Sequence, residues 1–323
     1  MVSINNEHDK TYKAFLEHKR TFLEFLQDFV HEEWVQDLQE DNLTLVDKSF
    51  ILKDYQEKEA DIIYEVKING TKVYFYLLLE LQSTVDYTMP YRLLLYMTEL
   101  WRQYFDNTDE RTKRNKSFKL PAIIPMLLYN GKKKWTVAQS FARYQNGYEK
   151  FDKHILDFEY ILFNVNGYNE KELYEIGSLM SAIFLLDQNI DKEEFISRFK
   201  RLVILIQRLS PEQWNRLKRW ILKILLPGIP ESNRNKIAEL IEESDIMEVD
   251  KMVMNLEVNF KKWMHDARQE GKQEGRQEGR QEGLFEAAKL ALQKGKSIDE
   301  VAELLELPYN IVEKLQKEIN PVN

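Results

Sequence analysis

The chain has 323 residues, of which 43% are hydrophobic and 31% charged, and its formal net charge at pH 7 is −8. Length and composition indicate a globular protein with one large or two medium domains, and the acidic balance argues against a uniformly basic nucleic-acid binder without excluding local basic patches. The absence of cysteine excludes disulfides, thiolate zinc sites and a cysteine nucleophile, and it fits a reducing cytoplasm. No apolar run approaches the ~18–20 residues of a membrane span and the first residues do not form a signal peptide, so we expect a cytoplasmic protein without membrane contact.

Apolar residues recur at helical spacing near the start of the chain. They are Phe15, Phe22, Phe25, Leu26 and Phe29. This spacing predicts one or two short amphipathic helices that pack on a sheet. Residues 43–52 are predicted as the first strand of that sheet.

Residues 61–82 have the composition of a β-hairpin. Both arms are rich in β-branched and aromatic residues, and the Asn-Gly dipeptide at 69–70 favours a tight turn, because both central positions of such a turn need positive φ. A two-residue loop makes Glu80 the diagonal neighbour of Asp61, and a four-residue loop places the two residues directly opposite each other. Either loop brings both carboxylates to one face, roughly 5–8 Å apart, whereas an odd-numbered loop separates them.

The second arm, residues 73–81, is apolar on both faces until Glu80, as in a strand that is covered on both sides. A carboxylate in such a layer costs several kcal/mol unless it is protonated, paired or bound to a cation. Gln82 points to the same face, so Asp61, Glu80 and Gln82 form a compact oxygen-ligand cluster that suits Mg²⁺ (or Mn²⁺), the cation that phosphodiester hydrolysis requires. The alternative is that both carboxylates are solvated at the ends of strands, and these residues alone leave the two interpretations open.

Residues 89–104 are predicted as a helix that starts near Pro90 and carries Arg92 and Tyr96 on one side. Arg92 follows the carboxylates closely enough to contact a phosphate, although a lone arginine on a helix is usually solvated. Residues 120–129 are predicted as a buried strand whose first half two prolines make irregular, and residues 158–165 as the last strand.

Three lysines, Lys132, Lys133 and Lys134, follow the strand at 120–129 and precede Trp135. A lysine cluster beside an aromatic residue can contact a nucleic-acid backbone, but charge runs of this kind are more often solvated turns.

From residue 169 onward the apolar period becomes helical. Cap signals mark three helix starts, at Asn169, Asp191 and Ser210. Residues 195–226 hold eight Arg or Lys against one acid, and residues 229–258 hold eight acids against three Arg or Lys. Either the acidic helices dock on the basic ones, or the basic face, with Arg216, Lys218 and Arg219, is a DNA surface.

Residues 269–283 repeat a glycine-containing tetrapeptide of the type Gln-Glu-Gly-Arg. On a helix this period places like charges in rows, and each glycine costs about 1 kcal/mol relative to alanine, so a lone helix is self-repelling and marginal. We expect a helical connector that a second copy orders, and hence a homo-oligomer, rather than a flexible linker. Residues 284–319 are predicted as a small helical packing or oligomerisation unit, since the last helix has too few cations for a DNA reader.

Several motifs, in order along the chain, resemble one known family. They are His8-Asp9-Lys10 with Tyr12-Lys13, Ala60-Asp61-Ile62-Ile63-Tyr64, Leu79-Glu80-Leu81-Gln82-Ser83, Met89-Pro90-Tyr91-Arg92 with Tyr96, and Leu120-Pro121 with Asn130-Gly131. Over roughly residues 7–210 this pattern resembles the recombination-promoting nucleases, or YhgA-like transposases, of bacteria.

The resemblance implies an α/β fold of the PD-(D/E)XK nuclease type and Mg²⁺-dependent cleavage of double-stranded DNA linked to recombination. It makes Asp61 and Glu80 the metal ligands and puts Gln82 where the common pattern has a lysine. Glutamine can orient an attacking water but supplies no charge, so a catalytically weak or inactive member that binds DNA or protein through its helical half is the alternative. The candidate DNA contacts are Lys10, Lys13, Arg92, Lys132, Lys133, Lys134, Arg216, Lys218 and Arg219.

The sequence therefore predicts four segments. Residues 1–168 form the PD-(D/E)XK α/β core, residues 169–227 a basic helical extension packed on it, residues 228–268 an acidic helical segment, and residues 269–323 the repeat with a terminal helical hairpin.

Overall fold

The structure is a computed structural model that describes residues 11–46, 62–68, 70–80, 85–229 and 231–319. The chain divides into two compact units, Met1–Met254 and Asn255–Asn323, and the boundary falls within the long helix α11 (Val249–Gln293). No helix in the described ranges is long and apolar enough to cross a membrane.

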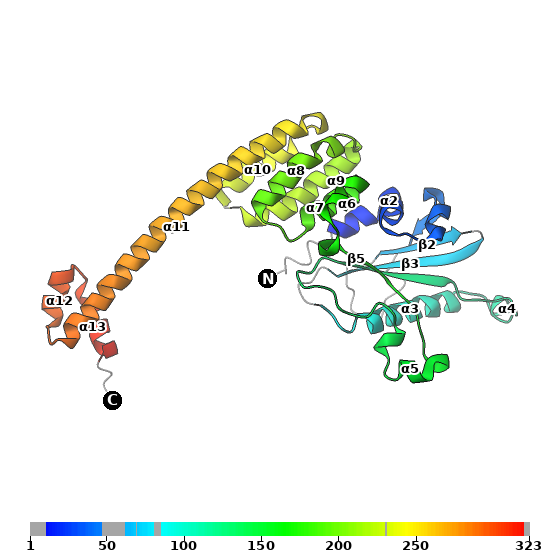
Figure 1. The fold of residues 1–323 in the computed structure, drawn as a ribbon, viewed down its shortest axis with the longest axis horizontal. Coiled ribbons are helices and arrows are strands. Elements are labelled where there is room, and N and C mark those ends of the chain that lie inside the picture. The colour runs from blue at the N-terminus through cyan, green and yellow to red at the C-terminus, as the bar shows by residue number, and fades with distance from the viewer. Residues whose placement is uncertain (1–10, 47–61, 69, 81–84, 230, 320–323) are drawn as a thin grey trace. The chain divides into compact units, whose positions relative to one another are not determined.

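Within the described residues, a mixed sheet of five strands forms the centre of the first unit (Figure 1). The strands, which lie side by side in chain order, are β1 (Leu43–Leu45), β2 (Ile62–Ile68), β3 (Thr71–Glu80), β4 (Ala122–Tyr129) and β5 (Ile161–Asn164). Strand β2 is antiparallel to both of its neighbours, β1 and β3, whereas β3, β4 and β5 are parallel. The α/β class predicted from the sequence is therefore confirmed.

The predicted hairpin is confirmed with the register of a two-residue loop. Ile68 pairs with Thr71 and Ile62 pairs with Leu77. Gly70 has φ of +80°, which a residue without Cβ adopts at little cost. Of the predicted first strand, residues 43–45 are β1 and the part beyond residue 46 lies outside the described residues.

Strand β4 begins at Ala122, so residues 120 and 121 of the predicted strand lie outside it. From Ala122 on the strand is regular through Pro125, and there the predicted irregularity was wrong. Pro125 pairs with Tyr76 in the ladder with β3, while the ladder with β5 begins one residue later, at Met126. The side of β4 that faces β5 is therefore unpaired at Pro125. Proline, which has no backbone N–H, is tolerated at such a position.

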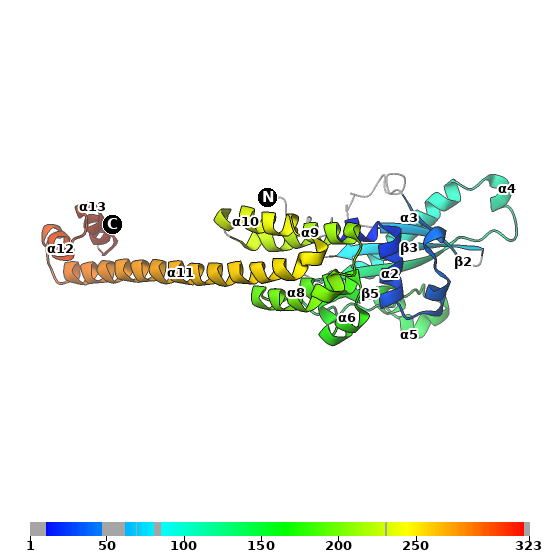
Figure 2. The ribbon, with the colours of Figure 1, turned by 90° about the horizontal axis from the view of Figure 1, so that it is seen from above.

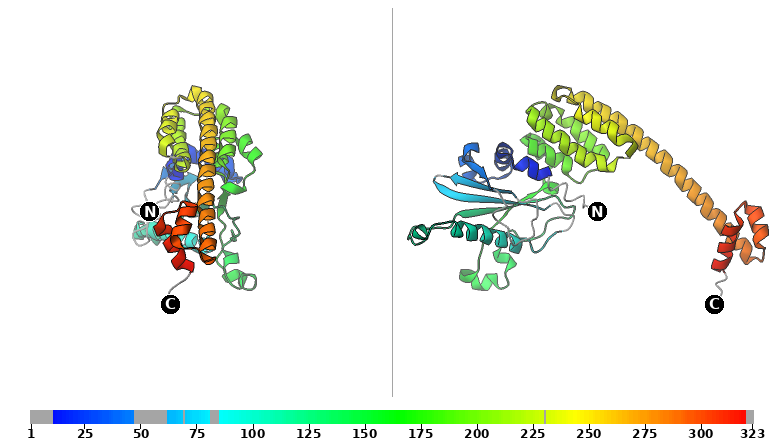
Figure 3. Two further views of the ribbon diagram at one scale, coloured as in Figure 1. Left: turned by 90° about the vertical axis from the view of Figure 1, so that its left-hand side faces the viewer. Right: turned by 180° about the vertical axis from the view of Figure 1, so that it is seen from behind.

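Helices cover both faces of the sheet (Figure 1, and from behind in Figure 3). Helix α3 (Met89–Asp106) packs on one face, where Leu93 and Met97 belong to the same buried cluster as Tyr76 of β3. Helices α2 (Lys19–Phe29) and α7 (Leu179–Asp187) cover the other face. The ring of Phe22 stacks on that of Tyr64 at 4.3 Å between centroids, which confirms the predicted packing of the first amphipathic helices on a sheet.

The remaining α-helices of the first unit lie outside these two layers or connect the strands. These helices are α4 (Glu110–Lys113), α5 (Tyr148–Phe151), α6 (Glu170–Ile176), α8 (Lys192–Ile206), α9 (Pro211–Leu225) and α10 (Glu231–Glu242). The three predicted caps are confirmed, since Asn169, Asp191 and Ser210 each accept a hydrogen bond from a backbone N–H of the first turn. Short 3₁₀ turns join several of these elements.

The second unit is a small helical cluster. Helices α12 (Ile298–Leu305) and α13 (Tyr309–Ile319) pack against the end of α11 through Leu292, Val301 and Val312. Helix α11 is continuous across residues 269–283 (Figure 2), so the predicted helical state of the repeat is confirmed.

Candidate active site

The parallel strands β3, β4 and β5 end together. Glu80 pairs with Tyr129, and Tyr129 pairs with Asn164, so three strand ends lie side by side. Strand β2 runs the opposite way and begins at Ile62, so its amino end lies at the same edge. We call this region the carboxyl edge. Ligand sites in α/β sheets form preferentially where parallel strands end.

Of the three predicted catalytic residues, the structure describes only the backbone of Glu80, which is the last position of β3 and lies at this edge. Asp61 and Gln82 lie outside the described residues. The residues that the structure describes contain no group of three or more His, Cys, Asp or Glu that could hold a metal ion. The metal site of Asp61 and Glu80 therefore stays a prediction, to which the structure adds the register of the hairpin.

Arg92 lies in the first turns of α3 and is fixed rather than freely solvated. Its Nη1 is 2.5 Å from Oδ2 of Asp86, and its side chain is only 17% exposed. Burial opposes ionisation of Asp86, but hydrogen bonds from Thr88 and Arg92 hold the pKa of that carboxyl below its usual value. One turn later Tyr96 stacks on Tyr76 of β3 at 5.3 Å, so this side of α3 faces the sheet.

The three lysines at 132–134, which we call the lysine loop, are exposed and follow β4 after Asn130 and Gly131. The loop is anchored by aromatic residues. The hydroxyl of Tyr129 donates to the carbonyl of Lys133 at 2.8 Å, and the ring of buried Trp135 lies 4.8 Å from that of Tyr129. The cations of the lysine loop are therefore held beside the carboxyl edge.

A buried carboxylate that the sequence analysis missed lies behind this edge. Asp187, the last residue of α7, accepts hydrogen bonds from the hydroxyl of Tyr12 at 2.7 Å and from Nδ2 of Asn130. Burial raises the pKa of Asp187 to about 7, although the bonds from Tyr12 and Asn130 oppose the rise, and burial also raises the pKa of Tyr12. The available signal was an acid at the end of an otherwise apolar run, the same signal that singled out Glu80.

Hydrogen bonds from side-chain amides connect the turn after β4 to the segments packed against it. Asn166 donates to Oδ1 of Asn130 at 2.8 Å and to the carbonyl of Gly131 at 3.2 Å. A Cβ at Gly131 would collide with the ring of Tyr129, so only glycine fits there. The turn that begins at Asn130 is therefore fixed from the loop after β5 and from the end of α7.

The predicted N-terminal contacts are described only in part. Lys10 lies outside the described residues. Lys13 forms an i,i+4 ion pair with Glu17 at 3.6 Å, and its side chain is 26% exposed.

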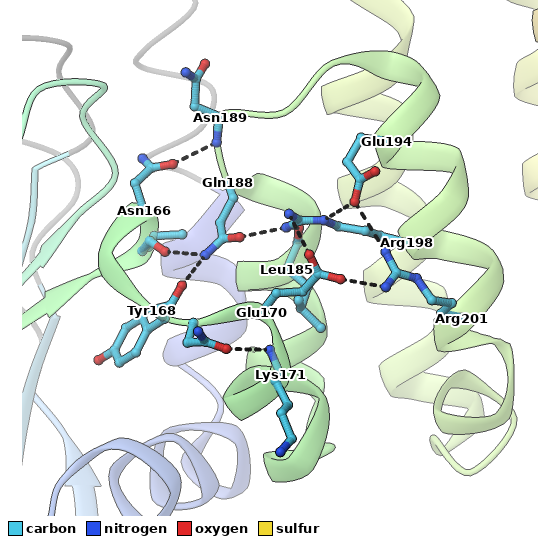
Figure 4. A network of polar contacts seen from close by, with 12 residues as sticks. Asn166, Tyr168, Glu170, Lys171, Leu185, Gln188, Asn189, Glu194, Arg198 and Arg201 are labelled. Carbon is cyan, nitrogen blue, oxygen red and sulfur yellow. Dashed lines mark hydrogen bonds and ion pairs between the residues drawn. The ribbon is translucent and has the colours of Figure 1, made fainter.

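Arg198 and Arg201 of the basic segment take part in an internal network (Figure 4). Arg198 is 8% exposed and donates to the carbonyl of Leu185 and to Glu194 at 2.8 Å each. Arg201 lies 2.6 Å from Glu170 and 3.2 Å from Glu194. These two arginines hold α6, α7 and α8 together.

The cations of α9 divide between two faces. Lys218 donates to the backbone carbonyls of Glu242 and Ser244, at 2.8 and 3.2 Å, so it serves the docking of α10 through carbonyls rather than carboxylates. Arg216 and Arg219 lie on another face, beside residues 11–15. The charge pattern left two alternatives, docking of the acidic helices and a DNA surface. Docking fits the face of α9 that carries Lys218, and a DNA surface fits the face that carries Arg216 and Arg219.

Comparison with known proteins identifies the family. The family model described as "Putative transposase, YhgA-like" matches residues 6–216, well over half of the chain, and the chain therefore belongs to this family. The resemblance found in the sequence motifs is confirmed.

Curated relatives carry nuclease names. The chain is 29% identical over 124 residues to "Recombination-promoting nuclease RpnD" of Escherichia coli O157:H7, a match that covers 38% of this chain and 45% of that protein. It is 27% identical over 124 residues to "Recombination-promoting nuclease RpnC" of Escherichia coli K12, with 38% of this chain and 39% of the relative covered. It is 26% identical over 127 residues to "Inactive recombination-promoting nuclease-like protein RpnE" of the same strain, with 39% and 40% covered. The matches span less than half the length of each of these relatives, and no solved structure matches the chain.

Proposed function

We propose that this protein is a metal-dependent DNA endonuclease of the PD-(D/E)XK type that hydrolyses phosphodiesters of double-stranded DNA in recombination. The observation that carries the proposal is the register of the β2–β3 hairpin. Its two-residue loop is one of the two even-numbered loops for which the strand period of two predicts Asp61 and Glu80 on one face. The nuclease names of RpnD and RpnC support the same reaction class.

The donor set fits Mg²⁺ or Mn²⁺. Asp61 and Glu80 would supply two carboxylates, and hard divalent cations bind through one or two carboxylates plus waters. When bound, the cation lowers the pKa of a coordinated water and neutralises charge on the phosphoryl oxygens. The side-chain amide of Gln82 would orient the attacking water by hydrogen bonding.

Binding of the DNA backbone would fall to Arg92 and the lysine loop. Arg92 is pre-positioned by Asp86, and a fixed guanidinium binds a phosphate with less loss of side-chain freedom than a mobile one. The lysine loop adds three exposed charges in the segment after β4. Lys10, Lys13, Arg216, Lys218 and Arg219 complete the proposed DNA contacts, with Lys218 the weakest of them because it already binds carbonyls of the α9–α10 junction.

A second candidate function is a weak or inactive member that binds DNA or protein through its helical half. Two observations favour it. Gln82 stands where the family's common pattern has a lysine, and RpnE, which is 26% identical to this chain, is named as inactive. Self-association through residues 269–283 remains a proposal in either case.

Nicking of supercoiled plasmid by the purified protein tests the choice. We expect Mg²⁺ or Mn²⁺ to support nicking, EDTA to abolish it, and both Asp61→Ala and Glu80→Ala to reduce it to background while the fold survives. Nicking by wild-type protein that persists in both alanine variants would reject these ligands. Wild-type protein that binds the plasmid but never cuts it would favour the second function.

A further inference from the structure

Two exposed tyrosines mark the start of α3. Tyr87 lies in the turn that leads into the helix and is 64% exposed, and Tyr91 lies in the first turn of the helix and is 49% exposed. Both side chains therefore offer aromatic surface to solvent at one end of α3.

This end of α3 lies at the carboxyl edge. The helix lies between the parallel strands β3 and β4 in the chain and runs along one face of the sheet (Figure 1). Its later part reaches the start of β4, where Nε1 of Trp101 donates to the carbonyl of Pro121 at 2.8 Å. Its beginning is bonded to the segment after β4, because the hydroxyls of Tyr87 and Thr136 share a hydrogen bond of 3.3 Å. Thr136 follows Lys134 by two residues, so Tyr87 lies beside the lysine loop.

The side chain of Tyr87 is held in place although it is exposed. The turn that carries it is fixed by Asp86, whose Oδ1 accepts from the backbone N–H of Thr88 at 2.8 Å and from its hydroxyl at 2.6 Å. The far end of the side chain is fixed by the bond to Thr136. A group that is already ordered loses little conformational freedom when a ligand packs on it.

The rings of both tyrosines are open to a ligand. Within the described part of the chain, neither ring packs on another aromatic ring or lies under a cation. Other exposed aromatic residues of the first unit differ in this respect. Nζ of Lys113 lies 4.6 Å from the centroid of the Phe105 ring, and the ring of Phe141 lies 6.0 Å from that of Tyr144.

An open aromatic ring beside a group of lysines suits a nucleotide whose base is unpaired. Lysines hold the phosphates of such a nucleotide, and an aromatic side chain stacks on the flat face of its base. Inside a duplex the neighbouring base pairs cover these faces. The ring of Tyr87 can therefore stack only on a base that has left the duplex stack or ends it.

We propose that Tyr87 stacks on an unpaired base of the DNA, with Tyr91 as a second aromatic contact, so that the protein prefers duplexes that contain unpaired nucleotides. This inference rests on the proposed function, because it takes DNA as the ligand of the carboxyl edge. The two tyrosines select the structure of the DNA rather than its sequence, since every base has a face that can stack.

The test measures binding of the full chain to two labelled DNAs of equal length, one fully paired and one with a short unpaired bubble. EDTA prevents cleavage, and the titrations are repeated at several salt concentrations. We expect wild type to bind the bubbled DNA roughly tenfold more tightly, as stacking of one or two bases predicts. Tyr87→Ala should lose most of this preference and bind the paired DNA nearly as wild type does. Its slope of log affinity against log salt should not change, because the lost ring carries no charge.

Two further variants separate the ring from the rest of the side chain and from aromatic surface in general. Tyr87→Phe keeps the ring and should keep most of the preference. Phe105→Ala is the matched control, since Phe105 is 46% exposed on the same helix, about 21 Å from Tyr91 at 1.5 Å per residue. It should leave the preference unchanged, and melting curves should show that all variants are folded.

The outcomes distinguish this inference from the proposed function. Equal affinity of wild type for the two DNAs, or an equal loss on both in Tyr87→Ala, would overturn the stacking role, while nicking of plasmid would keep the proposed function standing. Wild type that binds neither DNA would also overturn it. A preference that depends on Tyr87 in a protein that never nicks DNA would support stacking and reject the endonuclease.

Discussion

The hydroxyl of Tyr12 donates a 2.7 Å hydrogen bond to Oδ2 of Asp187, and the bond joins residues 175 positions apart in the chain. Asn130 donates to the same carboxylate oxygen. A segment near the start of the chain, the turn after β4 and the end of α7 therefore meet at one buried acid. Because Asp187 is buried, its ionisation is coupled to the stability of all three.

The first prediction concerns pH. The pKa of Asp187 is about 7 in the folded protein against an ordinary value of 3.8, so the folded state binds more protons between these values. The contribution of Asp187 to stability is then fully present below about pH 4 and is lost as pH rises through about 7, and a difference of this size corresponds to roughly 4 kcal/mol. We expect Asp187→Asn, which keeps the shape and cannot ionise, to become more stable relative to wild type as pH rises from 5 to 8.

Denaturant unfolding at several pH values measures this difference. Asp41→Asn, which removes an exposed carboxylate, is the matched control and should show no comparable trend. A constant gap between wild type and Asp187→Asn across the range would contradict the prediction.

The hairpin and the helix starts could be predicted because their signals are local. The Asn-Gly dipeptide determines the turn through the φ values it accepts, and the register follows by counting. The caps at Asn169, Asp191 and Ser210 are likewise local, since the side chain bonds to a backbone N–H within its own turn.

The contacts between distant segments could not be predicted in this way. Nothing near Asp187 in the sequence indicates Tyr12 or Asn130 as partners, because their contact depends on how α7 packs on the sheet. The basic residues 195–226 show the same limit. Their eight Arg and Lys suggest a single basic surface when they are counted in the sequence. In the structure, however, Arg198 is buried in a network, Lys218 binds carbonyls and Arg219 lines a cavity.

The second prediction concerns the lysine loop. Replacing Lys132, Lys133 and Lys134 by glutamine should weaken binding to every DNA sequence, because these cations neutralise backbone charge without reading bases. The salt slope should fall by ~0.9 for each phosphate that the variant no longer neutralises. Titrations of unrelated duplexes at several salt concentrations measure both effects.

The control is Arg111→Gln/Arg114→Gln/Lys116→Gln, which removes three charges from the segment that precedes the amino end of β4. That segment enters the sheet at the edge opposite the carboxyl edge, so its neutralisation should change binding less. Equal effects of the two triple variants would mean that the charge acts through the field of the whole protein rather than at the carboxyl edge.

The third prediction concerns Gln82. If Gln82 occupies the water-orienting position, Gln82→Lys restores a positive charge beside the attacking water and should raise the nicking rate by about tenfold or more, since a well-placed group of this kind contributes ~10²-fold or more. Gln82→Met, which has similar length and no hydrogen-bonding group, should lower the rate. A fall in rate for both variants would place Gln82 in a role that needs its amide.

The last prediction separates helix stability from assembly in the repeat. A Cβ added at Gly275, Gly279 or Gly283 meets no atom within 4 Å, so alanine fits at all three positions of α11. Each substitution should stabilise the helix by about 1 kcal/mol. If the glycines instead allow a second copy to approach closely, the triple alanine variant will be more helical and yet self-associate more weakly than wild type at low salt.

Circular dichroism measures the helix content and sedimentation equilibrium measures the self-association. The control is Gln273→Ala/Gln277→Ala/Gln281→Ala, which leaves the glycines in place. Association that is unchanged or stronger in the glycine variant, or absent in wild type, would show that this row of glycines is no contact between copies.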